Sequence, residues 1–165
     1  MGDRSVTRNC GPDLVRVGAG LPVAAYRDEI TTALHGGRAV IVAPPGTGKT
    51  TFVPPLVASR CSGRVIVTQP RRVAARAAAR RLATLTGTRP GEFASHTVHG
   101  ESTTTRDTKV EFVTTGVLLR RLLSDPDLTG VDAVVLDEVH ERHLDADLVV
   151  AMAVSYTHLR AHETD

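Results

Sequence analysis

Short apolar runs alternate with segments of helical composition along most of the chain. Apolar runs bounded by glycine, proline or polar residues predict strands, most of them buried, at residues 38–43, 64–68, 97–99, 108–114 and 131–136. Helix formers with glycine or proline stops predict helices between them, at residues 24–34, from 49 onward, at 71–86 and at 116–123. Strands that alternate with helices are typical of a parallel α/β sheet, in which ligands bind at the carboxyl ends of the strands.

Two of the predicted helices carry features that bear on their packing. The helix that begins near Lys49 meets two prolines at 54–55, which predict a kink or an early end because proline has no N–H to donate. Along residues 71–86, apolar residues recur at three- and four-residue steps and predict an inward face made of Ala74, Ala78, Leu82 and Leu85. The same segment carries an arginine stripe, of which Arg76 and Arg80 are most simply interpreted as a solvated face.

The two ends of the chain lack this pattern. Residues 1–20 are rich in glycine, arginine and aspartate without sustained periodicity, which predicts a flexible leader. Residues 155–165 break the preceding apolar pattern and read like translated adapter sequence, so we interpret them as a non-native tail. One domain is expected at residues 21–154, because a chain of 165 residues is long enough to bury one sizeable core.

The composition is that of an ordinary soluble globular protein, with 41% hydrophobic and 23% charged residues. Its apolar runs are too short to span a bilayer and residues 1–8 have no signal-peptide core, so a cytoplasmic protein without membrane contact is expected. Cys10 and Cys61 form no metal-binding pattern and are expected to be free thiols. Because aromatic residues are only 3%, a bound nucleic acid would be held by its backbone rather than by base stacking.

Residues 43–51, which read Ala-Pro-Pro-Gly-Thr-Gly-Lys-Thr-Thr, carry the first candidate chemistry. They follow a predicted strand and open a helix, and Gly46 and Gly48 allow several backbone N–H groups to converge on a phosphate. The helix N-terminus adds further donors and the positive end of its dipole. Lys49 supplies a compact charge for the terminal phosphates, and the hydroxyl of Thr50 can ligate Mg²⁺.

The loop departs from the full phosphate-binding pattern at one position. That pattern has glycine where this chain has Ala43, so a glycine- and proline-rich turn before an ordinary helix stays open as an alternative. The choice of lysine argues against that alternative. The chain has 20 lysines and arginines, of which only Lys49 and Lys109 are lysines, and arginine's planar fork does not fit a tight ring of backbone groups.

A second motif follows the predicted strand at residues 131–136. Asp137 at the end of that strand can hold the Mg²⁺ that bridges nucleotide phosphates, and Glu138 beside it can orient or deprotonate an attacking water. A zinc-protease helix is the competing interpretation, since histidines and a glutamate lie nearby. It fails on spacing, because His140 and His143 are three residues apart and the zinc motif needs four.

Four stretches together resemble the DEAH-box branch of the superfamily-two ATP-dependent helicases. They are Asp-Glu-Val-His-Glu-Arg at residues 137–142, Thr-Gln-Pro-Arg-Arg-Val-Ala-Ala at 68–75, Thr-Thr-Gly-Val-Leu-Leu-Arg at 114–120 and the phosphate loop. The loop is close to that of the bacterial HrpB-type helicases, which makes Ala43 a subgroup variant. The resemblance implies a RecA-like P-loop NTPase domain with a mostly parallel sheet at residues 21–154, truncated before its last strands.

The resemblance also implies roles for individual residues. The ATP phosphates and Mg²⁺ would be bound by Gly46, Thr47, Gly48, Lys49, Thr50 and Thr51, with Asp137 as the metal carboxylate and Glu138 as the catalytic base. His140 would couple this domain to a second one, and Arg81 would stack on adenine. The backbone of a single-stranded RNA or other nucleic acid would be contacted by Arg71, Arg72, Thr114 and Gly116. The sequence departs from the family pattern at Thr115, where an acid is usual, and at His99, where arginine is common.

The implied function is ATP hydrolysis coupled to movement on RNA or to its unwinding, with this chain as the N-terminal ATPase portion. A second RecA-like domain that supplies arginines to the γ-phosphate is expected outside this chain, as is a Ser-Ala-Thr motif whose strand lies between the strands of the two ATP motifs. The alternative is a non-catalytic module that binds ATP or nucleic acid. A P-loop kinase or transporter ATPase is disfavoured by the motifs at residues 68–75 and 137–142.

Overall fold

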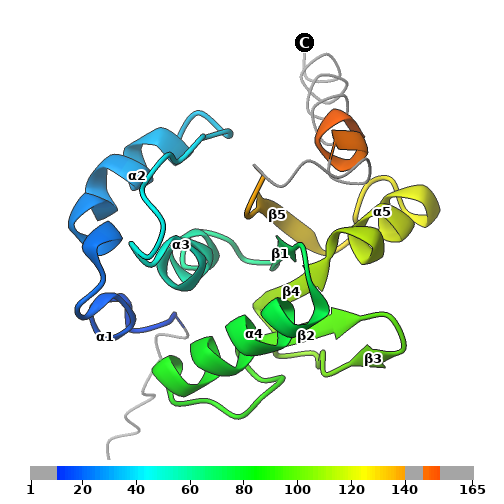
Figure 1. Cartoon of the computed structure of the whole chain (residues 1–165), viewed down its shortest axis with the longest axis horizontal. Helices are drawn as coiled ribbons and strands as arrows, with labels where there is room; N and C mark the ends of the chain where they lie inside the picture. Colours follow the sequence, from blue (N-terminus) through cyan, green and yellow to red (C-terminus); the bar gives the residue numbers. More distant parts are fainter. Residues whose placement is uncertain (1–10, 140–146, 153–165) are drawn as a thin grey trace, which may run out of the picture.

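The computed structural model describes residues 11–139 and 147–152, in which helices cover both faces of a five-stranded sheet (Figure 1). The strand order is β3-β2-β4-β1-β5, and all pairs are parallel except β2 with β3. The strands are β1 (Arg64–Gln69), β2 (Ala94–Val98), β3 (Glu101–Ser102), β4 (Val110–Thr114) and β5 (Val131–Leu136). The helices are α1 (Leu14–Gly18), α2 (Arg27–Leu34), α3 (Lys49–Ala58), α4 (Arg72–Thr86) and α5 (Thr115–Ser124), with a 3-10 helix, η1 (Pro22–Tyr26). The mostly parallel α/β architecture predicted from the sequence is therefore confirmed.

The centre of the sheet is buried on both faces, which explains why its strands read as continuous apolar runs. Val65, Ile66 and Val67 of β1 are all fully buried, whereas β5 at the sheet edge is mostly half-buried. One face packs against α1, α3 and α4, and the other against α5 and the helical residues 147–152 (Figure 1). No helix in the described part of the chain has the length and apolarity of a membrane-spanning segment.

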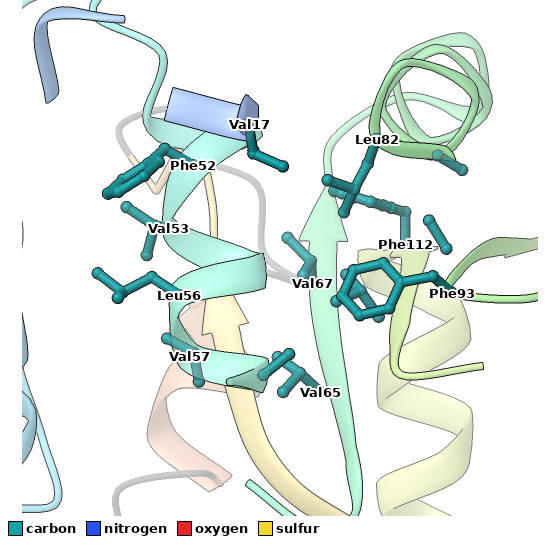
Figure 2. Close-up of a cluster of buried hydrophobic side chains, with 14 of the residues drawn as sticks. Val17, Phe52, Val53, Leu56, Val57, Val65, Val67, Leu82, Phe93 and Phe112 are labelled. Carbon is teal, nitrogen blue, oxygen red and sulfur yellow. The ribbon is translucent and has the colours of Figure 1, made fainter. Parts of the chain in front are cut away.

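The larger core lies between α3, β1 and α4, as Figure 2 shows. Phe52 and Leu56 of α3 are 1% and 2% exposed, and Phe112 of β4 is fully buried. Burial of a large apolar side chain contributes about 1.5–3 kcal/mol relative to its exposure. These contacts fix α3, and with it the loop at its N-terminus, against the sheet.

The strand predicted at residues 38–43 is absent from the sheet. This segment follows α2 without regular structure, and the side chains of Val40 and Val42 are 92% and 91% exposed. A strand requires a neighbour that pairs with its N–H and C=O groups. In the described residues the sheet ends at β5, and no strand lies beside this segment to pair with it.

The leader predicted at residues 1–20 is structured in part. Asp13 caps α1, since its Oδ1 accepts hydrogen bonds from the backbone N–H groups of Val15 and Arg16, each at 3.1 Å. Val17 on this helix is 1% exposed and lies beside Phe52 (Figure 2). A helix of five residues is too short to show a period in the sequence, which is why the pattern missed it. Residues 1–10 and the tail predicted at 155–165 lie outside the described residues.

The helix that begins at Lys49 continues through both prolines to Ala58. Each proline removes one intrahelical hydrogen bond, so an end was expected near them. Both rings are buried, however, together with the apolar side chains on either side of them in the sequence. The packing of this nearly all-apolar helix therefore outweighs the loss of two hydrogen bonds.

The buried face of α4 matches the predicted one only in part. Its buried residues are Ala75, Ala79, Leu82 and Ala83, so Leu82 is buried as predicted, and Ala78 and Leu85 are partly buried against the same core. Alanines stand at most positions of this segment, so the period is clear but its phase is not. Arg80 is exposed as predicted, but Arg76 is half-buried, and its Nε donates to Glu101 Oε2 at 3.1 Å. Arg76 therefore lies at the surface of α4 in an ion pair with Glu101.

Candidate functional site

The phosphate loop takes the backbone conformation that its glycines permit. Gly46 and Gly48 have φ angles of 77° and 91°, in the left-handed region that side chains disfavour. Gly48 is the N-cap of α3, and its carbonyl accepts hydrogen bonds from the N–H groups of Thr51 and Phe52. The backbone N–H of Val23 donates to the Thr47 carbonyl at 3.0 Å and joins the loop to η1. The N-terminus of α3 is thus presented at the loop.

Lys49 folds back over the loop that precedes it. Its Nζ donates to the carbonyls of Ala43 at 2.6 Å and Pro44 at 3.0 Å, and the Thr47 hydroxyl also donates to the Pro44 carbonyl, at 2.9 Å. These two acceptors of the ammonium are neutral carbonyls, so an anionic phosphate offers it a stronger partner. A Cβ placed on Gly46 would meet nothing within 4 Å, which leaves open space beside the loop. The loop therefore suits a polyphosphate.

Asp137 joins the acidic motif to the phosphate loop across 87 residues of sequence. Its Oδ2 accepts hydrogen bonds from the Thr50 hydroxyl and from Gln69 Nε2, the latter at 2.8 Å. Its Oδ1 accepts from the Glu138 backbone N–H at 3.0 Å, and its own N–H donates to the Thr68 hydroxyl at 3.3 Å. A hydroxyl and a carboxylate held together are oxygen ligands of the kind that Mg²⁺ prefers.

Glu138 is exposed and has a φ angle of 55°, which is unusual for a residue with a side chain. Such a conformation costs about 1–3 kcal/mol and often marks a functional position. Among the described residues no group of three or more histidine, cysteine, aspartate or glutamate side chains could hold a metal ion. His140 lies outside the described residues, and Arg81 is exposed on α4, so their roles stay predictions.

The four residues predicted to contact nucleic acid lie where β1 and β4 end. Arg71 is the N-cap of α4 and Arg72 its first residue, while Thr114 is the N-cap of α5 and Gly116 lies in its first turn. Gln69 and Thr114 are register partners on adjacent strands, which brings the two helix N-termini to neighbouring positions. Backbone N–H groups at helix N-termini and arginines are typical ligands of phosphates.

A second layer of polar contacts behind these residues was missed from the sequence. Arg72 Nη2 donates to the His99 carbonyl at 2.8 Å, and Arg120 Nη2 lies 3.3 Å from His99 Nδ1. Arg120 and Gln69 lie within the motifs at residues 114–120 and 68–75, so both residues could be noted in the sequence. Their contacts, with His99 and Asp137, could not be predicted from it. These contacts join the segment after β2 to α4 and α5.

Glu111 is the buried charge of this region. It is fully buried as the second residue of β4, and its two oxygens accept hydrogen bonds from Arg121 of α5, at 2.9 and 2.6 Å. Burial raises the pKa of the carboxyl, but hydrogen bonds from Arg121 and Thr97, together with the Arg121 charge, outweigh it and lower the pKa to about 2. The pair fixes α5 against the strand whose end carries Thr114. A charged residue inside an apolar run was its signal in the sequence.

Comparison with known proteins places this geometry in a family. Residues 26–162 match the family model of the DEAD/DEAH box helicases. The chain belongs to this family. The match extends over residues 155–162, which belong to the predicted non-native tail.

The chain is similar to helicases from bacteria and fungi. It is 42% identical over 135 residues to the ATP-dependent RNA helicase HrpB of Escherichia coli, covering 80% of this chain and 17% of that protein. It is 37% identical over 151 residues to the probable ATP-dependent RNA helicase DHR1 of Saccharomyces cerevisiae, covering 86% of this chain and 12% of that protein.

A solved structure shows the same similarity. The crystal structure of the Escherichia coli DEAH/RHA helicase HrpB matches with a TM-score of 0.78 and 40% identity, covering 82% of this chain and 18% of that one. The resemblance to the DEAH-box helicases and to their HrpB-type members, and the RecA-like fold that it implies, are confirmed. The chain spans less than a fifth of the length of HrpB and of DHR1.

Proposed function

We propose that the full-length protein is an ATP-dependent RNA helicase and that residues 21–154 form the first of its two RecA-like domains. The observation that carries this proposal is the hydrogen bond from Thr50 to Asp137, which unites the phosphate loop with the acidic motif. It lies at the carboxyl ends of β1 and β5, where ligands of parallel sheets bind. The relatives named as ATP-dependent RNA helicases support the choice of substrate.

In this proposal the loop binds the ATP phosphates through the backbone of residues 46–51 and the ammonium of Lys49. Thr50 and Asp137 hold Mg²⁺, which would neutralise charge on the phosphates when bound. Glu138 orients the attacking water and accepts its proton. Arg81 stacks on adenine.

The nucleic-acid side of the proposal uses the ends of β1 and β4. Arg71 and Arg72 neutralise phosphates of a single-stranded RNA, and the N-termini of α4 and α5 donate backbone N–H groups to others. Contacts of this kind hold a strand without reading its sequence. His140 transmits the state of the nucleotide to the second RecA-like domain. The protein is proposed to act in the cytoplasm.

The 165-residue chain alone is expected to bind nucleotide or RNA but not to catalyse repeated cycles of ATP hydrolysis. Arginines from a second domain would be missing from its site, and an arginine finger contributes about 10³- to 10⁵-fold to the rate of phosphoryl transfer. Multiple turnovers by this chain would contradict the assignment of the missing arginines to a second domain.

The proposal is tested by RNA-stimulated ATP hydrolysis of the full-length protein. Lys49→Ala and Glu138→Gln should each abolish it, because one removes the phosphate-binding charge and the other the base. The matched control is Lys109→Ala, which changes the other lysine, whose Nζ contacts the Ser62 carbonyl at 2.6 Å. Hydrolysis that survives in either site variant, or that RNA does not stimulate in the unchanged protein, would refute the proposed function.

A further inference from the structure

Gln69 is a buried polar residue that lies between the proposed nucleotide site and the proposed RNA-binding residues. It is the last residue of β1 and is 4% exposed. Its Nε2 donates to Asp137 Oδ2 at 2.8 Å, the same oxygen that accepts the Thr50 hydroxyl. A buried amide with a purely structural role could donate its hydrogen bond to any nearby acceptor. This one donates to the carboxylate that is proposed to hold the metal.

The sheet order places the nucleic-acid residues on the other side of Gln69. β1 lies between β4 and β5, and the Cα register partner of Gln69 on β4 is Thr114. Along the chain, only Pro70 separates Gln69 from Arg71, which caps α4. Proline fixes φ and stiffens this connection. The backbone of Gln69 is thus connected to Arg71 through Pro70 and lies beside Thr114 on the adjacent strand.

The chemistry of an amide suits this position. A lysine or arginine at residue 69 would neutralise the Asp137 carboxylate, whereas the glutamine N–H orients one of its oxygens and leaves its charge for a divalent cation. Partners that orient a metal ligand in this way typically change metal affinity by about 10- to 100-fold when they are removed.

We propose that Gln69 is a positioning residue that couples RNA binding at Arg71 and Thr114 to the orientation of the Asp137 carboxylate. This inference rests on the proposed function and adds to it the physical connection between the two binding regions. RNA phosphates that restrain the end of β1 hold the Gln69 amide against Asp137. Because linkage is reciprocal, nucleotide binding raises RNA affinity by the same factor.

The test measures this factor in the full-length protein. The dissociation constant of a single-stranded RNA is measured with and without a non-hydrolysable ATP analogue and Mg²⁺, and the ratio is the coupling factor. Gln69→Met keeps the length of the side chain without its donor, and Gln69→Asn keeps the amide but shortens its reach. Ser95→Ala, which removes a buried hydroxyl hydrogen bond to Thr104 from β2, is the matched control.

We expect a coupling factor of at least about fivefold in the unchanged protein and in Ser95→Ala, as is typical of coupled sites. In both Gln69 variants the factor should fall to near one, while RNA affinity without nucleotide stays within about twofold. The Mg²⁺ concentration that half-saturates binding of a fluorescent ATP analogue should rise about tenfold. A purely structural role would instead lower the melting temperature and both affinities together.

The outcomes separate this inference from the proposed function. Coupling retained in a folded Gln69→Met or Gln69→Asn variant overturns the inference and leaves the helicase proposal intact. A parallel loss of RNA affinity without nucleotide also overturns it, because Gln69 would then act on the RNA region alone. An unchanged protein in which RNA neither stimulates hydrolysis nor responds to nucleotide refutes the helicase proposal itself.

Discussion

Glu111→Gln should destabilise the protein at neutral pH and reduce the dependence of its stability on acid. In addition to Arg121, the Glu111 carboxylate accepts hydrogen bonds from Thr97 at 2.6 Å, Thr104 at 3.1 Å and Arg64 at 3.3 Å. Its pKa is lowered from 4.5 to about 2 in the folded protein. Since one pKa unit corresponds to about 1.4 kcal/mol, the ionised carboxylate contributes about 3 kcal/mol to the free energy of unfolding.

The direction of the pH effect follows from the lowered pKa. The contribution of Glu111 is fully present above the unfolded-state pKa near 4.5 and is lost as the pH falls through the folded-state value of about 2. Linkage with these two pKa values leaves about half of it at pH 3. The difference in stability between the unchanged protein and Glu111→Gln should therefore shrink by about half between pH 7 and pH 3.

Urea unfolding followed by far-ultraviolet circular dichroism measures this difference, because the chain has no tryptophan and two tyrosines. Glu101→Gln is the matched control. The Glu101 pKa is also lowered to about 2, by hydrogen bonds from Arg76 and His96, but its side chain is 41% exposed and solvent screens these contacts. Equal losses of stability in the two variants, or a Glu111 effect that does not change with pH, would refute the reasoning.

Three further predictions concern the loop, α1 and the RNA region. Gly48→Ala should weaken nucleotide binding about tenfold or more, because an alanine in the left-handed region costs about 1–2 kcal/mol and its methyl group would lie 2.9 Å from the Leu21 side chain. Titration with a fluorescent nucleotide measures this affinity, and Gly36→Ala is the control. Val17→Ala should lower the free energy of unfolding by about 2 kcal/mol in urea titrations, whereas Val15→Ala, at a site 78% exposed, should change it little. Arg72→Ala should weaken RNA binding equally for different sequences and reduce the slope of log affinity against log salt by about one; an effect confined to one RNA sequence would contradict a backbone contact.

The sequence predicted that the phosphate loop and Asp137 belong together, because their chemistry depends on residue type and spacing. The structure brings Thr50 and Asp137 into contact, while the roles of the site residues stay predictions. The residues that hold them were not identified, since Gln69 and Glu111 act through partners that are 68 and 10 residues away in the chain. Such partners become visible only when the strand order is known.

The errors in the fold have a common physical origin. Strand 38–43, the prolines of α3 and the phase of α4 were all judged from local composition, and in each case the outcome depends on neighbours distant in sequence. An apolar run becomes a strand only beside another strand, and a proline is tolerated in a helix when burial compensates. Local propensity is a weak prior that tertiary contacts override.

The phosphate loop is supported mainly by α3, the helix that follows it. Residues 38–43 give it no support from the sheet, and Val40 and Val42 stay exposed. The loop is fixed instead by the buried side chains of α3, by the backbone bond between Val23 and Thr47, and by the Thr50 contact with Asp137.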